Sequence, residues 1–327
     1  MRRREFITVV GGAIAAWPHA AFGEAQRIAI ASDSFPVSKM TETSGDPLFQ
    51  GLFSELRRLG YVEGQGLLIE RYSGGGHASR YADLAREVVN RDPDVIISIG
   101  SNTITLDFKA VTTTIPIVGI FHLPVEAGIV TSLAHPGGNI TGLSVDVGPE
   151  QWGKRIQLLQ QAVPQATVLG FLQSQASRDW WGPKVSDWGV TLVGPPLNNP
   201  IDEAEYRRVF AALVHDRAEG LLVDSEDVHV AILKLIVALA EKSRLPAIYP
   251  FKMFVQAGGL MSYGIDLPVF GHSIADMVGQ ILKGAKASEI PIRQPSKFEL
   301  VINLKTAKSL GLTIPATLLV AADEVIE

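Results

Sequence analysis

The chain has 327 residues, of which 46% are apolar and 19% are charged, and its formal net charge is −5. This composition is typical of a folded globular protein, and the length is sufficient for two domains of ordinary size. No run of Lys or Arg occurs beyond the first four residues, which argues against nucleic acid as a partner. The absence of cysteine excludes disulfides, thiolate metal sites, cysteine nucleophiles and a lipid-modified cysteine anchor.

The first 25 residues have the pattern of an export signal. The charged run Arg2–Arg4 precedes the apolar stretch 7–17, and a proline and several small residues follow. That stretch is shorter than the roughly 20 apolar residues of a membrane span. An arginine pair shortly before Phe6 is typical of a twin-arginine signal, with an ordinary secretory signal as the alternative. We therefore expect cleavage near Gly23 or Ala25 and a periplasmic protein that is not a lipoprotein.

Short β-branched runs alternate with helix-period segments from residue 26 onward. The expected strands of the first half cover residues 28–32, 67–72, 95–100 and 115–121. The expected helices between them cover residues 49–59, 84–89 and 104–110. Such alternation predicts a doubly wound parallel sheet.

The segment 136–143, PGGNITGL, breaks this pattern, and the alternation starts again after it. The second set of expected strands covers 166–172, 190–194, 220–224, 246–249 and 258–264, with helices at 152–163, 206–213, 228–243 and 274–282. We expect an N-terminal lobe of residues 26–143 with a return segment at 266–300, and a C-terminal lobe of residues 144–265. The tail 301–327 adds one more strand and helix, and its lobe stays open.

Motifs of common enzymes are missing from the sequence. It contains no G-x-S-x-G elbow and no P-loop, and no G-x-G-x-x-G follows the first strand. The seven histidines have no metal-ligand spacing. We therefore expect a protein that is not an enzyme and has no cofactor and no metal, with catalysis by Asp224 and His122 or His229 as a minor alternative.

Polar residues gather where the expected strands end, and ligands of open α/β sheets bind beyond the carboxyl ends of the strands. The candidate ligand-binding residues at these ends are Ser32, Asp33, Ser101, Asn102, Thr103, Phe121, His122, Gln173, Asp224, Ser225 and Tyr249. The group 101–103 lies before an expected helix, where hydroxyl and backbone N–H groups suit a carboxylate; a plain helix cap is the alternative. Asp224 is expected either to accept from a ligand ammonium group or to cap the next helix.

Several stretches resemble one family when they are taken together and in order. They are LRRLGYVEGQ, IGSNTITLDFKAVTTTIPIV, SLAHPGGNITGL, RLPAIYPFKMFVQAGGLMSYG and KFELVINLKTAKSLGLTIP. From about residue 27 to its end, the chain resembles the ABC-transporter substrate-binding proteins typified by tryptophan- and tyrosine-binding uptake proteins. The resemblance implies a type I periplasmic-binding-protein fold, with two Rossmann-like lobes joined by crossover strands around a ligand cleft. It also implies Thr141 and Tyr263 as cleft residues, whereas Trp180 and Trp181 line the cleft or pack on the lobe.

This resemblance implies that the protein captures a small polar or aromatic, amino-acid-like metabolite. Closure of the lobes around the ligand would then present a composite surface to an ABC permease and its ATPase. The alternative is a sensory module that closes in the same way and docks on a signalling receptor. We expect a monomer with no nucleic-acid partner.

Overall fold

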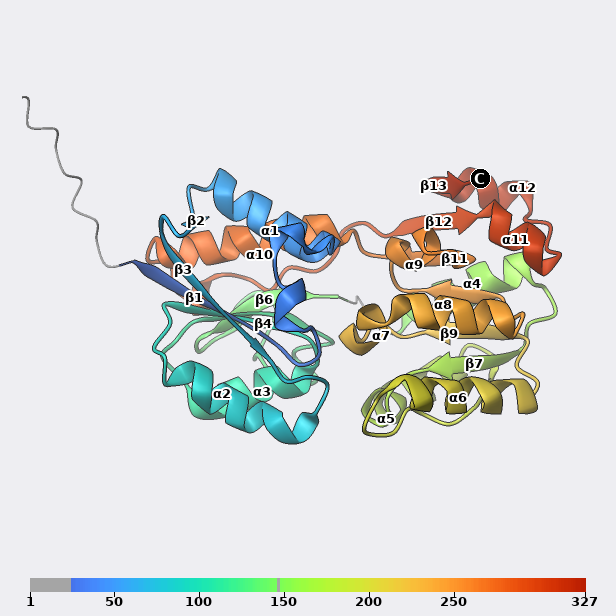
Figure 1. The fold of residues 1–327 in the computed structure, drawn as a ribbon, viewed down its shortest axis with the longest axis horizontal. Helices are drawn as coiled ribbons and strands as arrows, with labels where there is room; N and C mark the ends of the chain where they lie inside the picture. The colour runs from blue at the N-terminus through green and yellow to red at the C-terminus, as the bar shows by residue number, and fades with distance from the viewer. Residues whose placement is uncertain (1–24, 146–147) are drawn as a thin grey trace, which may run out of the picture.

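The computed structural model describes residues 25–145 and 148–327, and it contains two lobes side by side (Figure 1). The predicted leader, 1–25, lies almost entirely outside the described residues. In the described part of the chain, no helix has the length and apolar character required to cross a membrane.

The first lobe is built on a six-stranded parallel sheet with the order β2-β3-β1-β4-β5-β6. Its strands are β1 (Gln26–Ser32), β2 (Val62–Glu63), β3 (Gly66–Ser73), β4 (Val95–Ile99), β5 (Ile117–Phe121) and β6 (Ile140–Ser144). Its helices are α1 (Pro47–Arg58), α2 (Tyr81–Val89), α3 (Asn102–Val111) and α10 (Leu267–Leu282), with short 3-10 turns η1 (Val37–Lys39), η2 (Glu42–Ser44), η3 (Ala78–Arg80) and η4 (Ala287–Glu289).

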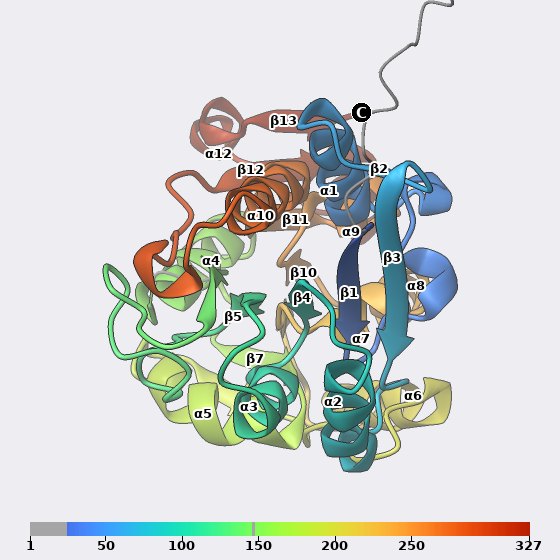
Figure 2. The same ribbon diagram turned by 90° about the vertical axis from the view of Figure 1, so that its left-hand side faces the viewer.

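Side chains of β1 alternate between the two faces of this sheet, as the period of a strand requires. Ile28 and Ile30 pack in the core shared with α1 and α10, whereas Ala29 and Ala31 pack with α2 and α3. The two helix layers on opposite faces are visible in both views of the ribbon (Figures 1 and 2). Helix α10 comes from residues far along the chain, so the first lobe is not a continuous segment.

The second lobe contains a seven-stranded sheet with the order β13-β12-β11-β10-β9-β7-β8. Its strands are β7 (Val168–Leu172), β8 (Thr191–Val193), β9 (Gly220–Val223), β10 (Ala247–Tyr249), β11 (Met261–Gly264), β12 (Glu299–Asn303) and β13 (Glu324–Ile326). Its helices are α4 (Glu150–Ala162), α5 (Gln175–Ser186), α6 (Glu203–His215), α7 (Asp227–Ala231), α8 (Leu233–Lys242), α9 (Lys252–Gln256), α11 (Leu304–Leu310) and α12 (Ala316–Ala321). All neighbouring strands are parallel except β11 and β12, which are antiparallel.

The tail whose lobe the sequence left open extends the second sheet, because β12 pairs with β11 and β13 pairs with β12. The two sheets with helices on both faces confirm the predicted α/β class of two doubly wound lobes. The chain passes between the lobes after β6, after β11 and before β12. The loops that follow the carboxyl ends of the strands in one sheet face the corresponding loops of the other sheet, in the space between the lobes.

Three details of the predicted elements differ from the structure. The helix expected over 228–243 is divided at Ile232, whose φ of −125° and ψ of 27° separate α7 from α8. Helix α5 had no counterpart among the expected elements; Pro183 lies inside it, and its apolar residues have weak helical periodicity. Helix α10 begins at Leu267, before the expected range of 274–282, with Asp266 accepting a hydrogen bond from Val269 N at 3.3 Å.

Candidate functional site

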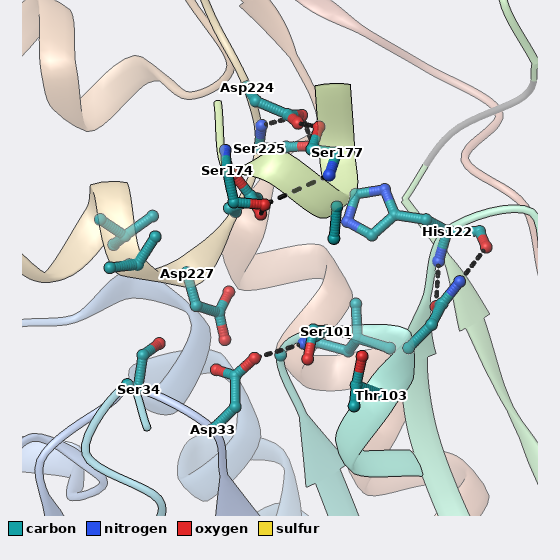
Figure 3. A pocket seen from close by; sticks show the side chains of 18 of the residues that line it. Asp33, Ser34, Ser101, Thr103, His122, Ser174, Ser177, Asp224, Ser225 and Asp227 are labelled. Carbon is teal, nitrogen blue, oxygen red and sulfur yellow. Dashed lines mark hydrogen bonds between the residues drawn. The ribbon is translucent and has the colours of Figure 1, made fainter. Parts of the chain in front are cut away.

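A cavity of about 550 Å³ lies between the lobes, at the carboxyl ends of the strands of both sheets (Figure 3). The first lobe contributes loops after β1, β4 and β5, and the second contributes loops after β7, β9 and β10. This is the position at which open α/β sheets bind their ligands.

The wall from the first lobe is centred on Asp33, which follows β1. Its Oδ2 accepts a hydrogen bond from the backbone N–H of Ser101 at 2.6 Å, so the carboxylate is fixed against the start of α3. Gly100 allows this approach, because its φ is +129° and a Cβ there would lie 2.4 Å from the Asp33 carboxylate. Asp33 is 7% exposed, and its Oδ1 is buried without a hydrogen-bond partner among the described residues. Burial raises the pKa of this carboxyl, with the Ser101 hydrogen bond as a partial offset.

The side-chain amide of Asn102 holds the loop after β5 in place. Its Nδ2 donates to the backbone oxygen of His122 at 2.6 Å, and its Oδ1 accepts from the backbone N–H of His122 at 2.9 Å. This reciprocal pair joins the loop after β5 to α3, and the His122 side chain lies beside the cavity (Figure 3). Ser101 Oγ is buried with no hydrogen-bond partner in the described part of the chain, and Thr103 lines the cavity from the next turn.

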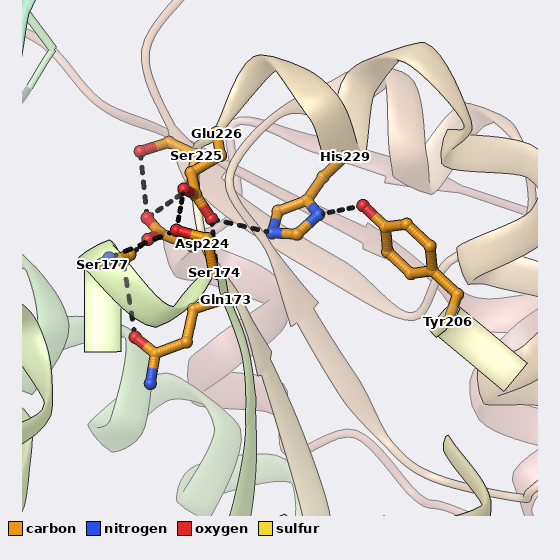
Figure 4. Close-up of polar contacts among 8 residues, drawn as sticks. All are labelled: Gln173, Ser174, Ser177, Tyr206, Asp224, Ser225, Glu226 and His229. Atoms are coloured by element: carbon orange, nitrogen blue, oxygen red, sulfur yellow. Dashed lines mark hydrogen bonds and ion pairs between the residues drawn. The ribbon is translucent and has the colours of Figure 1, made fainter. Parts of the chain in front are cut away.

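The wall from the second lobe is a connected hydrogen-bond network (Figure 4). Asp224 accepts from Ser225 N at 2.6 Å and from Ser177 Oγ. Glu226 accepts from Ser174 N at 2.8 Å and from Ser174 Oγ at 2.6 Å. These bonds tie the loop after β9 to the start of α5.

Two buried side chains extend this network away from the cavity. His229 Nε2 lies 3.5 Å from Glu226 Oε2, and His229 Nδ1 lies 2.7 Å from the hydroxyl of Tyr206 (Figure 4). Burial opposes ionisation of Glu226, but the contacts with His229 and Ser174 prevail and lower the pKa of its carboxyl. Burial raises the pKa of Asp224, and the negative charge of Glu226 raises it further. The surroundings of Glu226 therefore favour its ionised form more than those of Asp224 do.

Asp227 differs from its neighbours because its carboxylate points away from the network and toward Asp33 (Figure 3). Its Oδ2 is buried and has no hydrogen-bond partner among the described residues. Burial raises the pKa of Asp227 well above its ordinary value, and the charges of Asp33 and Asp46 add to this effect. Two carboxylates from opposite lobes thus face each other across the cavity.

Aromatic side chains form much of the remaining surface. Those that line the cavity include Phe35 and Phe270 near the first lobe and Trp180, Trp181 and Phe251 in the second. The two tryptophans, whose position the sequence left open, both line the cavity, although Trp181 is only 3% exposed and also packs against Trp152. Among the described residues, no group of three or more His, Asp or Glu side chains is placed to hold a metal ion.

Comparison with known proteins identifies the family. The model of the family described as "ABC transporter substrate binding protein" matches residues 37–179 and 203–326. The chain belongs to this family. The predicted resemblance to ABC-transporter substrate-binding proteins is therefore confirmed.

A curated relative of this substrate-binding protein is the tyrosine-binding protein of Clostridioides difficile (strain R20291), which is 25% identical over 292 residues, covering 84% of this chain and 80% of the relative. A solved conserved domain protein from Vibrio cholerae matches with a TM-score of 0.80 and 24% identity, over 92% of this chain and 99% of that one. The solved ABC domain in complex with L-Trp from Streptococcus pneumonia matches with a TM-score of 0.78 and 23% identity, with the same coverage. These structures confirm the predicted type I periplasmic-binding-protein fold.

Part of the predicted ligand-binding set lies in the cavity of this substrate-binding protein. The candidates that line it are Asp33, Ser101, Asn102, Thr103, His122, Asp224 and Ser225. All of them follow the last residue of a strand, where the chain leaves the sheet. Their loops meet between the lobes because the sheets present their carboxyl ends to each other.

The other candidates do not line the cavity. Ser32 is fully buried, and its Oγ accepts from the backbone N–H groups of Ser34 and Phe35, so it shapes the turn that carries Asp33. Phe121 is buried beside Gly119 in the core of the first lobe. Thr141 Oγ1 donates to the backbone oxygen of Ile290 at 2.7 Å. Ser32, Phe121 and Thr141 lie within strands, so their side chains face the sheet layers rather than the loop ends.

Three candidates of the second lobe also lie elsewhere. Gln173 is fully buried behind the cavity wall, where its Oε1 accepts from Ser177 Oγ at 3.4 Å. Tyr249 is 1% exposed and stacks on Phe254 at 5.0 Å between ring centroids, so it belongs to the core. Tyr263 stacks on Phe298 at 5.5 Å, outside the cavity. The expected pair of cleft-facing tyrosines is thus not present in this arrangement.

Several cavity residues were missed by sequence reasoning. Glu226 and Asp227 directly follow Asp224-Ser225, and the run Asp-Ser-Glu-Asp was the available signal for them. Ser177 belongs to the first turn of α5, a helix that the sequence pattern did not indicate. Asp46 lines the cavity and caps α1, accepting from Leu48 N at 3.0 Å.

Proposed function

We propose that this substrate-binding protein is exported to the periplasm, captures a small amino-acid-like metabolite between its lobes and delivers it to an ABC permease. The observation that supports this most strongly is the cavity with polar groups from both lobes. A ligand that contacts Asp33 from one side and Asp227 from the other stabilises the closed arrangement more than the open one. The ligand itself would therefore bring about closure.

The proposed ligand-binding residues are the candidates that line the cavity, together with Ser177 and Asp227. A cavity of about 550 Å³ is of the size that holds small metabolites, with apolar walls and a few convergent polar groups. The tyrosine-binding relative supports an amino-acid-like solute of similar size. Such a carrier needs no bond chemistry, and we propose that it has no enzymatic activity.

Export is supported by the sequence of the leader. The arginine run before an apolar stretch supports a cleaved signal, and the absence of cysteine argues for release as a free chain rather than a lipid-anchored one. In the periplasm, closure around the ligand would present one composite surface to the permease. We propose a monomer, which suits a carrier that diffuses between the membrane and the solute.

A ligand screen followed by an uptake assay tests this function. Thermal unfolding of the purified chain should be measured with a broad panel of amino acids, amines, organic acids and sugars, and co-purified small molecules identified by mass spectrometry. A ligand at a hundred times its Kd is expected to add about 2.7 kcal/mol to the free energy of unfolding and several degrees to Tm. The absence of any shift and of any co-purified molecule would refute ligand capture. Undiminished uptake of the identified ligand in a deletion strain would refute transport and favour sensing.

A further inference from the structure

We propose that the solute is an organic cation, an amine with an apolar body and no carboxylate, whose ammonium group lies between Asp33 and Asp227. This inference rests on the proposed function, because it names the class of solute held by the same cavity. It keeps the ammonium group of an amino-acid-like ligand but excludes the carboxylate, and a different experiment decides it.

The charged residues that line the cavity are almost all acidic. The carboxylate-bearing ones are Asp33, Asp46, Asp224, Glu226 and Asp227. No Lys or Arg is present among the described lining residues, and His122 is the titratable base in that set. A cavity with this balance attracts a cation and repels an anion.

Two of these carboxylates have an acceptor oxygen for which the described residues provide no hydrogen bond. Asp46, Asp224 and Glu226 are used within the protein, at the start of α1 and in the network of the second lobe. Asp33 Oδ1 and Asp227 Oδ2 are buried and have no partner among the described residues. Asp33 itself is more than nine-tenths buried, and Figure 3 shows its carboxylate directed into the cavity, toward Asp227.

An ammonium group satisfies both of these oxygens at once. It has three N–H donors and a positive charge, and hydrogen bonds between ionised partners are about twice as strong as neutral ones. Each of the two carboxyls has a raised pKa, caused mainly by burial, and a cation between them would favour the ionised forms and so offset that rise. Because Asp33 belongs to the first lobe and Asp227 to the second, the same ion holds the lobes together.

A ligand carboxylate would lie next to a protein carboxylate at either helix N-terminus of the cavity. Helix N-termini are the usual anion sites of such cavities, and α3 and α5 both begin here. At α3, however, the N–H of Ser101 binds Asp33, and at α5 the N–H of Ser174 binds Glu226. Each terminus therefore already has a protein carboxylate. The unpartnered indole N–H of Trp180 is a neutral donor that suits a hydroxyl or carbonyl oxygen of the ligand.

The aromatic lining suits the rest of such a solute. Phe35, Trp180, Trp181, Phe251 and Phe270 line the cavity with apolar surface that suits the body of such a solute. Lys184 Nζ already lies over the rings of Trp180 and Trp181, at 4.3 and 5.7 Å from their centroids, so the position of the ammonium group is assigned from the carboxylates alone. An apolar amine thus matches both the charge and the surface of the cavity.

Matched compounds with the same body and different head groups test the inference on the purified mature chain by isothermal titration calorimetry. The three sets are 2-phenylethylamine, phenylalanine and 3-phenylpropanoate; tryptamine, tryptophan and indole-3-propionate; and 3-methylbutylamine, leucine and 4-methylpentanoate. In at least one set, we expect the amine to bind at least about tenfold more tightly than the amino acid, and the acid not to bind.

Two results would overturn it: no binding by any of the three amines, or an amino acid that equals or exceeds its amine in affinity. Neither result touches the proposed function, which fails only if the broad panel and the co-purified material yield no ligand at all. The two proposals are therefore refuted by different outcomes.

Asp227→Asn tests the role of the facing pair. It removes a charge and keeps the shape, and we expect a loss of about 10- to 100-fold in affinity for the bound amine, because a hydrogen bond to a charged group is lost. Asp33→Asn should have a similar effect. The matched control is Asp83→Asn, since Asp83 lies on the surface of α2 with a single exposed ion pair to Arg86. Unchanged amine affinity in Asp227→Asn, with Tm showing a folded protein, would refute the assigned position of the ammonium group.

Discussion

The two walls of the cavity are built from the same kind of loop, yet they use their polar groups differently. On the second-lobe wall, Asp224 and Glu226 bind serines of α5, and His229 and Tyr206 continue the network into the core. On the first-lobe wall, Asp33 has one bonded and one unbonded oxygen, and Ser101 Oγ has no partner among the described residues.

This difference indicates which polar groups of the cavity are already fixed by protein hydrogen bonds and which are available to a ligand. A network whose members satisfy one another is rigid before any ligand arrives. Buried groups without partners, in contrast, gain the most from a ligand, because each one is costly until it is paired. We infer that the serine–carboxylate network gives the second lobe a preformed part of the surface. The unpaired groups that a ligand can satisfy come from both lobes, Asp33 and Ser101 from the first and Asp227 and the Trp180 indole from the second.

The largest effect is expected from removing the centre of the second-lobe network. Glu226→Ala leaves Ser174 N and Ser174 Oγ without their acceptor and removes the carboxylate that lies 3.5 Å from His229 Nε2. We expect the free energy of unfolding to fall by about 3 kcal/mol, measured by urea denaturation. Glu203→Ala on the exposed face of α6 is the matched control and should cost under about 0.5 kcal/mol. A loss at Glu226 no larger than that of the control would contradict the comparison.

The next largest effect is expected at Gly100. In Gly100→Ala, the new Cβ would overlap the Asp33 carboxylate, at a φ that L-residues rarely adopt. We expect about 2 kcal/mol of lost stability and at least tenfold weaker ligand binding, measured by urea denaturation and calorimetry. Gly284→Ala is the control, because its φ is +98° and nothing lies within 4 Å of its Cβ position, so it should keep its ligand affinity. Equal affinities in the two variants would show that the position of Asp33 is not critical.

A smaller effect is expected at the buried end of the network. Tyr206→Phe removes the hydroxyl that contacts His229 Nδ1 at 2.7 Å and keeps the packed ring. We expect a loss of about 1 kcal/mol in the free energy of unfolding, and little change in ligand affinity because the cavity is not touched. Tyr263→Phe, which removes a hydroxyl from a ring outside the cavity, serves as the control. A strong effect on affinity would mean that the second-lobe wall is less rigid than its hydrogen bonds suggest.

We expect the smallest effect in the pH dependence of the free energy of unfolding of the ligand-free protein. Opening of the lobes separates Asp227 from Asp33 and so relieves the repulsion between their carboxylates. The pKa of Asp227 is raised, so the folded state binds its proton more tightly than the unfolded state does. This stabilisation is complete below the ordinary value of 3.8 and is lost as pH rises through the raised pKa. Asp227→Asn has no carboxyl group to titrate at this position. Its free energy of unfolding, relative to that of the wild type, should therefore increase from pH 4 to pH 7.

The titratable groups that surround Asp227 in the cavity are Asp33, Asp46, Tyr81, His122, Asp224 and Glu226. All of them remain in the variant, so the difference between the two proteins isolates Asp227. Urea denaturation at each pH measures it. A difference that stays constant with pH would show that Asp227 is not held in the acidic surroundings described above.

The sequence was sufficient to predict the lobes but only part of the cavity. Buried strands such as 95–99 and amphipathic helices such as α1 are set by local periodicity, which can be read without a structure. Helix α5 was missed because Pro183 and weak periodicity hide it, and Ser177 was lost with it as a binding residue.

Most errors within the predicted site have one geometrical cause; Gln173 is the exception, because it follows β7 and is nevertheless buried outside the cavity. Asp33 and Asp224 were predicted because they come just after a strand, where the chain turns away from the sheet. Tyr249 is the last residue of β10 itself, and its ring is directed into the core next to Phe254. Which way a terminal strand residue points depends on the register and twist of the whole sheet, and a single sequence does not state these.

The position of α10 has a consequence for how the protein is made. Gly51 of α1 and Gly271 of α10 let the two helices touch, since a Cβ at either would meet backbone of the other helix at 2.3 or 2.2 Å. Helix α10 leaves the ribosome only after strands β7 to β11, and the sheet of the second lobe is completed later still by β12 and β13. Neither lobe can therefore finish folding on its own while the chain is being synthesised. A chain that stops before residue 267 would expose the glycine-bearing face of α1. The segment from residue 267 onward is therefore needed to complete both lobes.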